Sequence, residues 1–249
     1  MSDRLAKARK LAGILRVPAW RAVLRHHRVA AGVEHAVVLR NVGPLRTVVD
    51  IGANRGQFAL AARHLFPQAR IVSFEPLAAP AALWRKVFAG DGQAELIEVA
   101  VGPESGTAQI HLSARDDSSS LLPITVLQNA LFPGTAEAGT ATIRVVRLAD
   151  ALPAADIEAP ALLKLDVQGL ALQALAGCGD VLDRFTWVYV ECSFVELYAG
   201  QAFADEVIAW LRERGLVLRG VYNVTDDRHG LAVQADFLFG RVGAADGRC

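Results

Sequence analysis

The sequence predicts an α/β protein in which helices cover both faces of a mostly parallel sheet. Three observations support this fold class. Short apolar runs recur along the chain and alternate with stretches of helical periodicity, and several of the runs end in an acidic residue. The chain has 249 residues, 53% of them hydrophobic, which is enough for one such domain. Nothing in the composition indicates disorder or a coiled coil.

The alternation of strands and helices begins near residue 46. Residues 47–51 form a short apolar run that meets a glycine, as a buried parallel strand does, and residues 56–66 place apolar side chains on one helical face. The same patterns predict strands at 70–75, 94–101, 161–166 and 185–191, and helices at 77–89, 169–177 and 202–214. Residues 216–222 and 235–241 are predicted to close the sheet as an antiparallel pair.

Two segments stand outside this alternation. Residues 1–44 are interpreted as a short helical extension, with two helices over 2–30 that are separated near Pro18. Residues 103–148 contain two alternating strands around a loop with serine and proline, and we interpret them as an insertion that forms a loop or lid. The main domain is therefore expected to span 45–249, with the insertion inside it.

Charge is balanced over the chain but uneven along it. The net charge of zero argues against a dominant nucleic-acid surface, yet residues 1–28 hold eight Lys and Arg and a single acid. The first helix carries an apolar stripe, namely Leu5, Ala8, Leu11, Ala12 and Leu15. We interpret it as a helix that packs on the domain with a solvated basic face. The alternative is a membrane-surface helix, so peripheral membrane contact stays open.

The cysteines and the apolar runs bear on the compartment. Cys178, Cys192 and Cys249 form no CxxC pair, and their odd number argues against a disulfide framework. The N-terminus lacks the apolar core of a signal peptide, and no apolar run reaches the length of a membrane span. Reduced thiols and a cytoplasmic location are therefore expected.

Acidic residues stand at the ends of four predicted strands: Asp50, Glu75, Asp166 and Glu191. Ligands of open parallel sheets bind beyond the carboxyl ends of the strands, so four acids in register there indicate a site rather than isolated helix caps. Glu75 can accept hydrogen bonds from both hydroxyls of a ribose. A dinucleotide fingerprint would need glycines where Asn54 and Gln57 stand, so an adenosine-type ligand without pyrophosphate fits better than NAD.

Four segments carry a family resemblance. VVDIGANRGQFAL, IVSFEP, SSSLL and LLKLDVQG resemble, in order and spacing, the FkbM family of S-adenosylmethionine-dependent methyltransferases. The resemblance implies a class I, Rossmann-like fold and S-adenosyl-L-methionine as cofactor. It further implies O-methylation of a sugar, glycoconjugate or natural product. The cofactor-binding residues that it implies are Asp50, Gly52, Ala53, Asn54, Gly56, Gln57, Phe58, Glu75, Pro76 and Asp166. The chain departs from the family at Gln168, where the family often has DVEG.

An alcohol must lose a proton during methyl transfer, and the candidate general bases are Asp166, Glu191 and His229. Asp166 is favoured by its position at the end of a strand. The acidic pairs at 116–117 and 226–227 fit turns, so no metal is predicted. Three other histidines flank the N-terminal helices and are expected at the surface: His26, His27 and His35.

Several functions remain compatible with these observations. The acceptor is expected to be a small molecule or a glycan with a free hydroxyl, but an N- or C-methyltransferase can use the same fold. A catalytically inactive cofactor-binding scaffold is a third hypothesis, against which the intact Asp50, Gly52 and Glu75 argue. An NAD-dependent enzyme is a fourth. The identity of the acceptor and the oligomeric state do not follow from the sequence.

Overall fold

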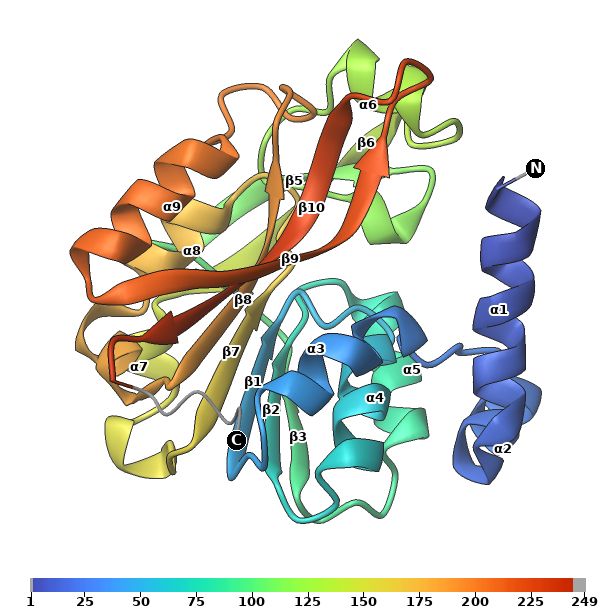
Figure 1. Ribbon diagram of the computed structural model, residues 1–249. Helices are drawn as coiled ribbons and strands as arrows, with labels where there is room; N and C mark the ends of the chain where they lie inside the picture. The colour runs from blue at the N-terminus through green and yellow to red at the C-terminus, as the bar shows by residue number, and fades with distance from the viewer. Residues whose placement is uncertain (1, 244–249) are drawn as a thin grey trace.

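The structure, a computed structural model that describes residues 2–243, confirms the α/β fold (Figure 1). Its main sheet has the strand order β3-β2-β1-β7-β8-β10-β9. The strands are β1 (Thr47–Ile51), β2 (Arg70–Phe74), β3 (Ala94–Ile97), β7 (Ala161–Leu165), β8 (Trp187–Ser193), β9 (Leu216–Asp226) and β10 (Ala232–Arg241). In this sheet β3, β2, β1, β7 and β8 run parallel to one another, and β10 lies between β8 and β9 and is antiparallel to both. The expected C-terminal antiparallel pair is thus present.

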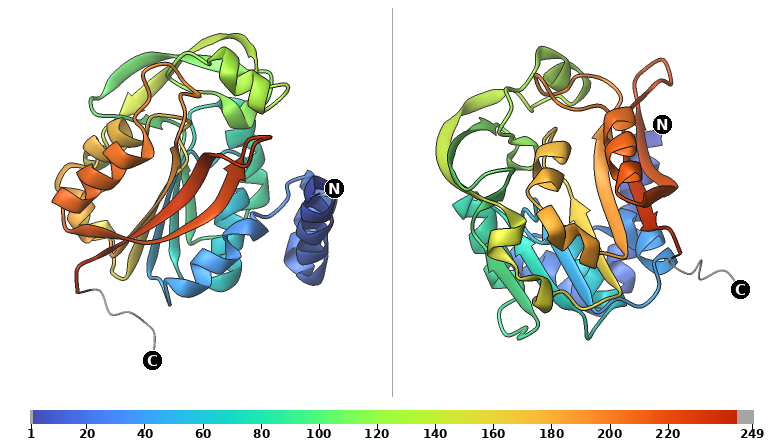
Figure 2. Two further views of the ribbon diagram at one scale, coloured as in Figure 1. Left: turned by 45° about the horizontal axis from the view of Figure 1, so that its top comes forward. Right: turned by 90° about the vertical axis from the view of Figure 1, so that its left-hand side faces the viewer.

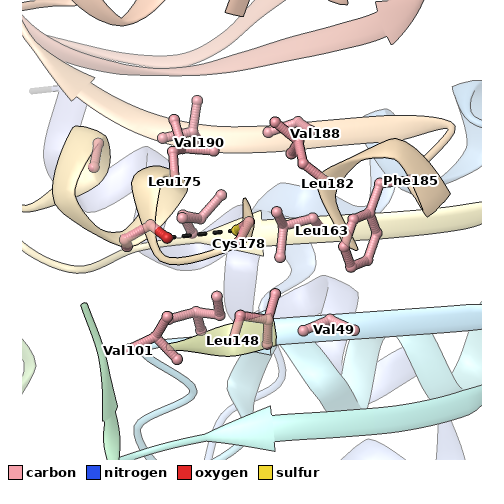
Figure 3. Close-up of a cluster of buried hydrophobic side chains, with 14 of the residues drawn as sticks. Val49, Val101, Leu148, Leu163, Leu175, Cys178, Leu182, Phe185, Val188 and Val190 are labelled. Carbon is pink, nitrogen blue, oxygen red and sulfur yellow. Dashed lines mark hydrogen bonds between the residues drawn. The ribbon is translucent and has the colours of Figure 1, made fainter. Parts of the chain in front are cut away.

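Helices cover both faces of this sheet (Figure 2). One face packs against α4 (Gln57–Leu65) and α5 (Ala78–Val87), and the other packs against α7 (Leu148–Ala151), α8 (Ala171–Ala176) and α9 (Ala204–Glu213). Figure 3 shows the core on the second face, which includes Val49, Leu163, Leu175 and Val190. Because β1 and β7 are covered on both sides, every residue in them is buried, and both strands read as nearly continuous apolar runs.

The cysteines of the described chain are packing residues. Cys178 and Cys192 are buried free thiols, and the Cys178 thiol donates to the backbone oxygen of Ala174 at 3.4 Å (Figure 3). Burial raises the pKa of Cys178 to about 12, so this thiol stays protonated and unreactive at neutral pH. Cys249 lies outside the described residues. Within residues 2–243, no helix is long and apolar enough to cross a bilayer.

The N-terminal extension joins the domain through its second helix. α1 (Ser2–Arg16) and α2 (Pro18–His27) are separated near Pro18, as predicted, because proline is accommodated at the first position of a helix but not in its interior. Trp20 of α2 is buried, and its indole N–H donates to the backbone oxygen of Leu60 in α4 at 3.2 Å. The short helices η1 (Val33–His35) and α3 (Ala36–Asn41) then lead into β1.

α1 packs against the rest of the chain through Ile14 and not through the predicted apolar stripe, whose described side chains are exposed. Leu11 and Leu15 are 48% and 47% exposed, whereas Ile14 is buried. Gly13 of α1 faces the side chain of Val33 in η1. Periodicity defined the stripe but could not identify its partner. Peripheral membrane contact stays a prediction.

The insertion at residues 103–148 forms a second, three-stranded sheet over the carboxyl ends of the main strands (Figures 1 and 2). It contains β5 (Gly106–Ser113), the short helix α6 (Val126–Leu131) and β6 (Glu137–Val146), and β4 (Ala100–Val101), which directly precedes it, is the third strand of the sheet. The single strand predicted at 94–101 was wrong. β3 ends at Ile97, where the backbone N–H of Val99 donates to the backbone oxygen of Ile97 and forms a tight turn. After this turn, β4 leaves the main sheet and pairs with β6.

Candidate active site

A cavity of about 400 Å³ lies at the carboxyl ends of the main strands, beneath the insertion. Its size is that of a small-molecule site. The main sheet contributes Gly52, Ala53, Asn54, Gln57, Phe58, Glu75, Pro76, Asp166, Gln168 and Glu191 to its wall. The insertion contributes residues that include Ser118, Ser120 and Gln128, and the N-terminal extension contributes Lys10, Glu34 and His35. Three of the four strand-end acids therefore line one cavity.

The loop between β1 and α4 requires glycine. Gly52 has a φ of +77°, and a Cβ atom at this position would overlap the backbone oxygen of Asp166. Gly56, with a φ of +87°, likewise lies in the left-handed region. The backbone N–H groups of Gly52 and Ala53 both donate to the oxygen of Phe74, each at 3.0 Å. The loop is thus wedged between β2 and β7, with its backbone against the cavity.

Glu75 joins the ends of β1 and β2 at the cavity wall. Its Oε2 accepts from the backbone N–H of Asn54 at 2.9 Å, and its Oε1 accepts from that of Leu77 at 2.8 Å. Burial raises the pKa of Glu75 to about 7, and the two backbone donors offset only part of that rise. Each oxygen keeps a second lone pair, so the carboxylate can accept two further hydrogen bonds from a diol.

A buried lysine ties β1 to β7. Lys164 is the register partner of Asp50, and its Nζ lies 3.2 Å from Asp50 Oδ1 and 3.5 Å from Asp166 Oδ2. It also donates to the backbone oxygen of Gly52 at 3.3 Å. Burial alone would lower the pKa of Lys164, but the charges of Asp50 and Asp166 outweigh burial and raise it. Asp50, predicted as a cofactor contact, is fully buried beneath the loop and supports it through Lys164.

Gln168 links two of the predicted acids. Its Nε2 donates to Asp166 Oδ1 at 2.7 Å and to Glu191 Oε2 at 3.1 Å. The other oxygen of Glu191 accepts from Gln234 of β10 at 2.9 Å. Burial raises the pKa of Glu191 well above its ordinary value, and the charges of Asp166 and Asp236 raise it further. Sequence reasoning found the two acids but not the amides that hold them.

His35 is a site residue that sequence reasoning missed. It was expected at the surface, but its ring lies edge-on to Phe58 and lines the cavity. Its Nδ1 is 3.0 Å from the hydroxyl of Tyr189, which donates to Asp236 at 2.7 Å. Burial lowers the pKa of His35, although the charge of Asp236 opposes this shift. No motif surrounds His35, so only its tertiary position reveals it.

His229 lies away from the other two candidate bases. It is exposed at the turn between β9 and β10, where Arg228 Nε donates to its Nε2 at 3.0 Å, and it does not line the cavity. The structure therefore brings Asp166 and Glu191 together and leaves His229 apart. The length of the hairpin, which the sequence did not define, carries its turn beyond the site.

The acidic pairs lie in different local structures, since residues 116–118 form a short 3-10 helix, Asp226 ends β9 and Asp227 begins the turn after it. Asp117 pairs with Arg115 at 2.9 Å, and Asp227 accepts the backbone N–H groups of His229 and Leu231. The side chain of Asp116 lies outside the described part. Among the residues that the structure does describe, no group of three His, Cys, Asp or Glu side chains could hold a metal ion.

The residues of the cavity fit an adenosine-type cofactor. Apolar side chains line the wall near β3 and the insertion and suit a purine ring: Phe74, Leu77, Val99, Val101, Ile110 and Ile143. Glu75 suits the ribose diol. The crowded backbone at Gly52 leaves no room for a larger residue. Asp166 and Glu191 provide negative charge for a cationic group such as a sulfonium.

A family model and several known proteins match this chain. The family model described as the methyltransferase FkbM domain matches residues 50–218. The 2-O-methyltransferase NoeI of Sinorhizobium fredii is 29% identical over 164 residues, which cover 64% of this chain and 68% of that protein. Methyltransferase sdnD of Sordaria araneosa is 25% identical over 220 residues, which cover 78% and 80%. Fibrillarin of Aeropyrum pernix, solved with natively bound S-adenosyl-L-methionine, aligns with a TM-score of 0.48 at 12% identity over 84% of this chain and 74% of that one.

Proposed function

Since the chain belongs to the FkbM family of S-adenosylmethionine-dependent methyltransferases, we propose that it methylates a hydroxyl group of a sugar or glycoconjugate. The observation that carries this proposal is the contact of Asp166 and Glu191 through Gln168 at one end of the cavity. A hydroxyl acceptor must give up a proton, and a pair of carboxylates can receive it. The name of the relative NoeI, a 2-O-methyltransferase, supports transfer to an oxygen atom.

The cofactor is proposed to bind along the loop between β1 and α4. When bound, S-adenosylmethionine supplies an electrophilic methyl group on a positively charged sulfur. Glu75 would hold the ribose hydroxyls, and the backbone at Gly52 and Ala53 would face the methionine part. Asp166 and Glu191 would then face both the sulfonium charge and the acceptor. The role of the protein is to align the acceptor oxygen with the methyl carbon and to exclude water.

Polar residues of the cavity wall suit a polyhydroxylated acceptor. Gln128, Ser118 and Gln234 line the cavity together with Glu191. Amide and carboxylate groups can bind neighbouring hydroxyls with two hydrogen bonds at a time. Gln128 is buried, and its Oε1 has no hydrogen-bond partner among the described residues. An unpartnered buried amide at the cavity wall is suited to a ligand hydroxyl.

Calorimetric titration with S-adenosylmethionine, S-adenosylhomocysteine and NAD tests the cofactor assignment. We expect the first two to bind and NAD not to bind. Glu75→Ala should weaken S-adenosylmethionine binding by roughly 10- to 100-fold, because it removes two hydrogen bonds to a carboxylate. A folded protein that does not bind S-adenosylmethionine would contradict the assignment.

A screen with methyl-labelled cofactor tests the acceptor class. Methyl glycosides with free hydroxyls are offered beside simple amines of similar size, and labelled products are separated by chromatography. Label on a sugar oxygen supports the proposal. Label on amines alone, or no product from protein that binds the cofactor, would refute O-methylation of sugars.

A further inference from the structure

Gln168 is held firmly at the end of β7. Its backbone lies in the left-handed region, with a φ of +49°, and Gly169 follows with a φ of +90°. Ser120 of the insertion donates its hydroxyl to the backbone oxygen of Gln168 at 2.6 Å. The hydroxyl of Tyr198, a buried residue of the loop after β8, contacts the side-chain Oε1 of Gln168. Two distant segments therefore fix both the backbone and the side chain of this residue.

These contacts determine which way the amide faces. Because the Tyr198 hydroxyl donates to Oε1, the Nε2 of Gln168 is directed at Asp166 and Glu191. Ionised carboxylates carry like charges and only accept hydrogen bonds, so two neighbouring carboxylates repel each other. A hydrogen-bond donor between them reduces this repulsion. The amide supplies that donor without adding charge. A glutamate at the same position would place a third acid against the pair.

We propose that Gln168 is a positioning residue whose amide holds Asp166 and Glu191 together in their ionised form, so that the pair can receive the proton of the acceptor hydroxyl. This inference rests on the proposed function. In the transfer, the acceptor oxygen bonds to the methyl carbon, and the sulfur–methyl bond breaks with its electron pair left on sulfur. The hydroxyl proton passes to the pair, which then shares it. One positive and one negative charge disappear together, so the net charge of the site is unchanged.

The charges around the pair oppose its ionised form, so a hydrogen-bond donor is needed there. Burial raises the pKa of Glu191, the charges of Asp166 and Asp236 raise it further, and the charge of Lys164 lowers it. Asp117 of the insertion also faces this region, and its negative charge helps to raise the pKa of the Tyr198 hydroxyl. The surroundings thus favour protonation of Glu191, and hydrogen-bond donors to the ionised form work against it.

The test uses cofactor binding and needs no acceptor. Affinities for S-adenosylmethionine, which is cationic at sulfur, and for neutral S-adenosylhomocysteine are measured by calorimetry across roughly pH 5 to 9. Their ratio should fall as the pH drops through the titration of the pair, because the cation prefers the ionised form. Gln168→Leu removes the donor and should move the midpoint up by about one pH unit. Gln168→Glu adds an acid and should move it further up.

A matched control makes the same charge change elsewhere. Gln109 is exposed on β5, away from the cavity, and donates to Thr142 of β6 at 2.8 Å. Gln109→Glu should leave the midpoint of the ratio where it is in the wild type. Unchanged midpoints in both Gln168 variants, with S-adenosylhomocysteine still bound, would overturn the proposal.

A second variant covers the case in which Gln168→Leu does not fold. Glu191→Gln keeps the shape of the side chain and removes one of the two carboxyl groups, so the midpoint should move down from the wild-type value. A midpoint that stays at the wild-type value would refute the shared pair. If the midpoint shifts but no sugar is methylated, only the acceptor assignment fails. If sugars are methylated but no midpoint shifts, only the role of Gln168 fails.

Discussion

At the β1–β2 end of the cavity the polar contacts involve backbone groups, whereas at the β7–β8–β10 end they join side chains to one another. The first end is built from consecutive residues of one loop and from Glu75, whose carboxylate binds two backbone N–H groups. The second end is built from Asp166, Gln168, Glu191 and Gln234, which three separate segments bring together through side-chain hydrogen bonds.

This difference predicts which substitutions each end of the cavity tolerates. Contacts through backbone groups tolerate many side chains but not an added atom at a crowded position. Contacts between side chains tolerate small changes in shape, but each lost donor leaves a buried acceptor unsatisfied. The substitutions below test the two ends in order of expected effect.

The largest effect is expected at Gly52. Gly52→Ala would combine a left-handed backbone with overlap against the backbone of Asp166, and should cost about 3 kcal/mol or more of the free energy of unfolding. Gly90 is the matched control, because its φ is +88° and a Cβ atom added there would meet nothing within 4 Å. Gly90→Ala should cost about 1 kcal/mol. Equal costs in denaturant unfolding would show that the loop is not wedged.

Glu75 should make the stability of the unliganded protein depend on pH. Its pKa is raised from 4.5 to about 7 in the folded state, so the folded protein binds more protons than the unfolded chain between these values. The free energy of unfolding should therefore be highest below about pH 4.5 and fall by roughly 3 kcal/mol as the pH rises through 7. Glu75→Gln should remove this dependence. Parallel unfolding curves of both proteins across this range would contradict the burial of the carboxyl.

Tyr198→Phe tests the side-chain end more gently. It removes the hydroxyl that orients Gln168, and we expect a loss of about 1 to 2 kcal/mol in thermal or chemical unfolding. Binding of S-adenosylhomocysteine should change less than threefold, because the other end of the cavity is intact. Tyr222→Phe is the control, since that hydroxyl accepts from Asn41 at 3.3 Å near the surface. A larger loss in the control would argue against a special role for Tyr198.

The smallest effect is expected at His229. The residue is exposed at a turn and lies outside the cavity, so His229→Ala should leave the methylation rate within about twofold and stability within about 0.5 kcal/mol. The measurement is the initial rate with whichever acceptor the screen provides. A hundredfold loss would restore His229 as the candidate base and remove that role from the pair at Asp166 and Glu191.

The fold was largely predictable because its signals are local. Buried parallel strands appear as apolar runs, and Pro18 separates two helices at the position where it stands in the chain. The β1–α4 loop was predictable for the same reason, since its glycines and Glu75 form contiguous motifs. The cavity wall at this end is therefore close to what the sequence indicated.

The contacts between distant side chains could not be predicted without the order and register of the strands. The partners of Lys164 follow from the register of β1 against β7, which the sequence does not state. His35 and Gln234 reach the cavity from opposite ends of the chain, and no local pattern links them. The outward stripe of α1 has the same explanation, because an apolar face records burial only once its partner is known. Element type is thus local information, whereas contacts between distant side chains are not.

The place of β10 sets an order in which the protein can be completed during synthesis. β9 is made before β10, yet within the main sheet it pairs only with β10. β9 therefore has no strand to join in the main sheet until β10 has left the ribosome. The residues of the β1–α4 loop and Glu75 emerge long before Gln234 and Asp236 do. A growing chain can form the β1–α4 end of the cavity early, but the end that contains Glu191 is complete only once Gln234 of β10 has emerged.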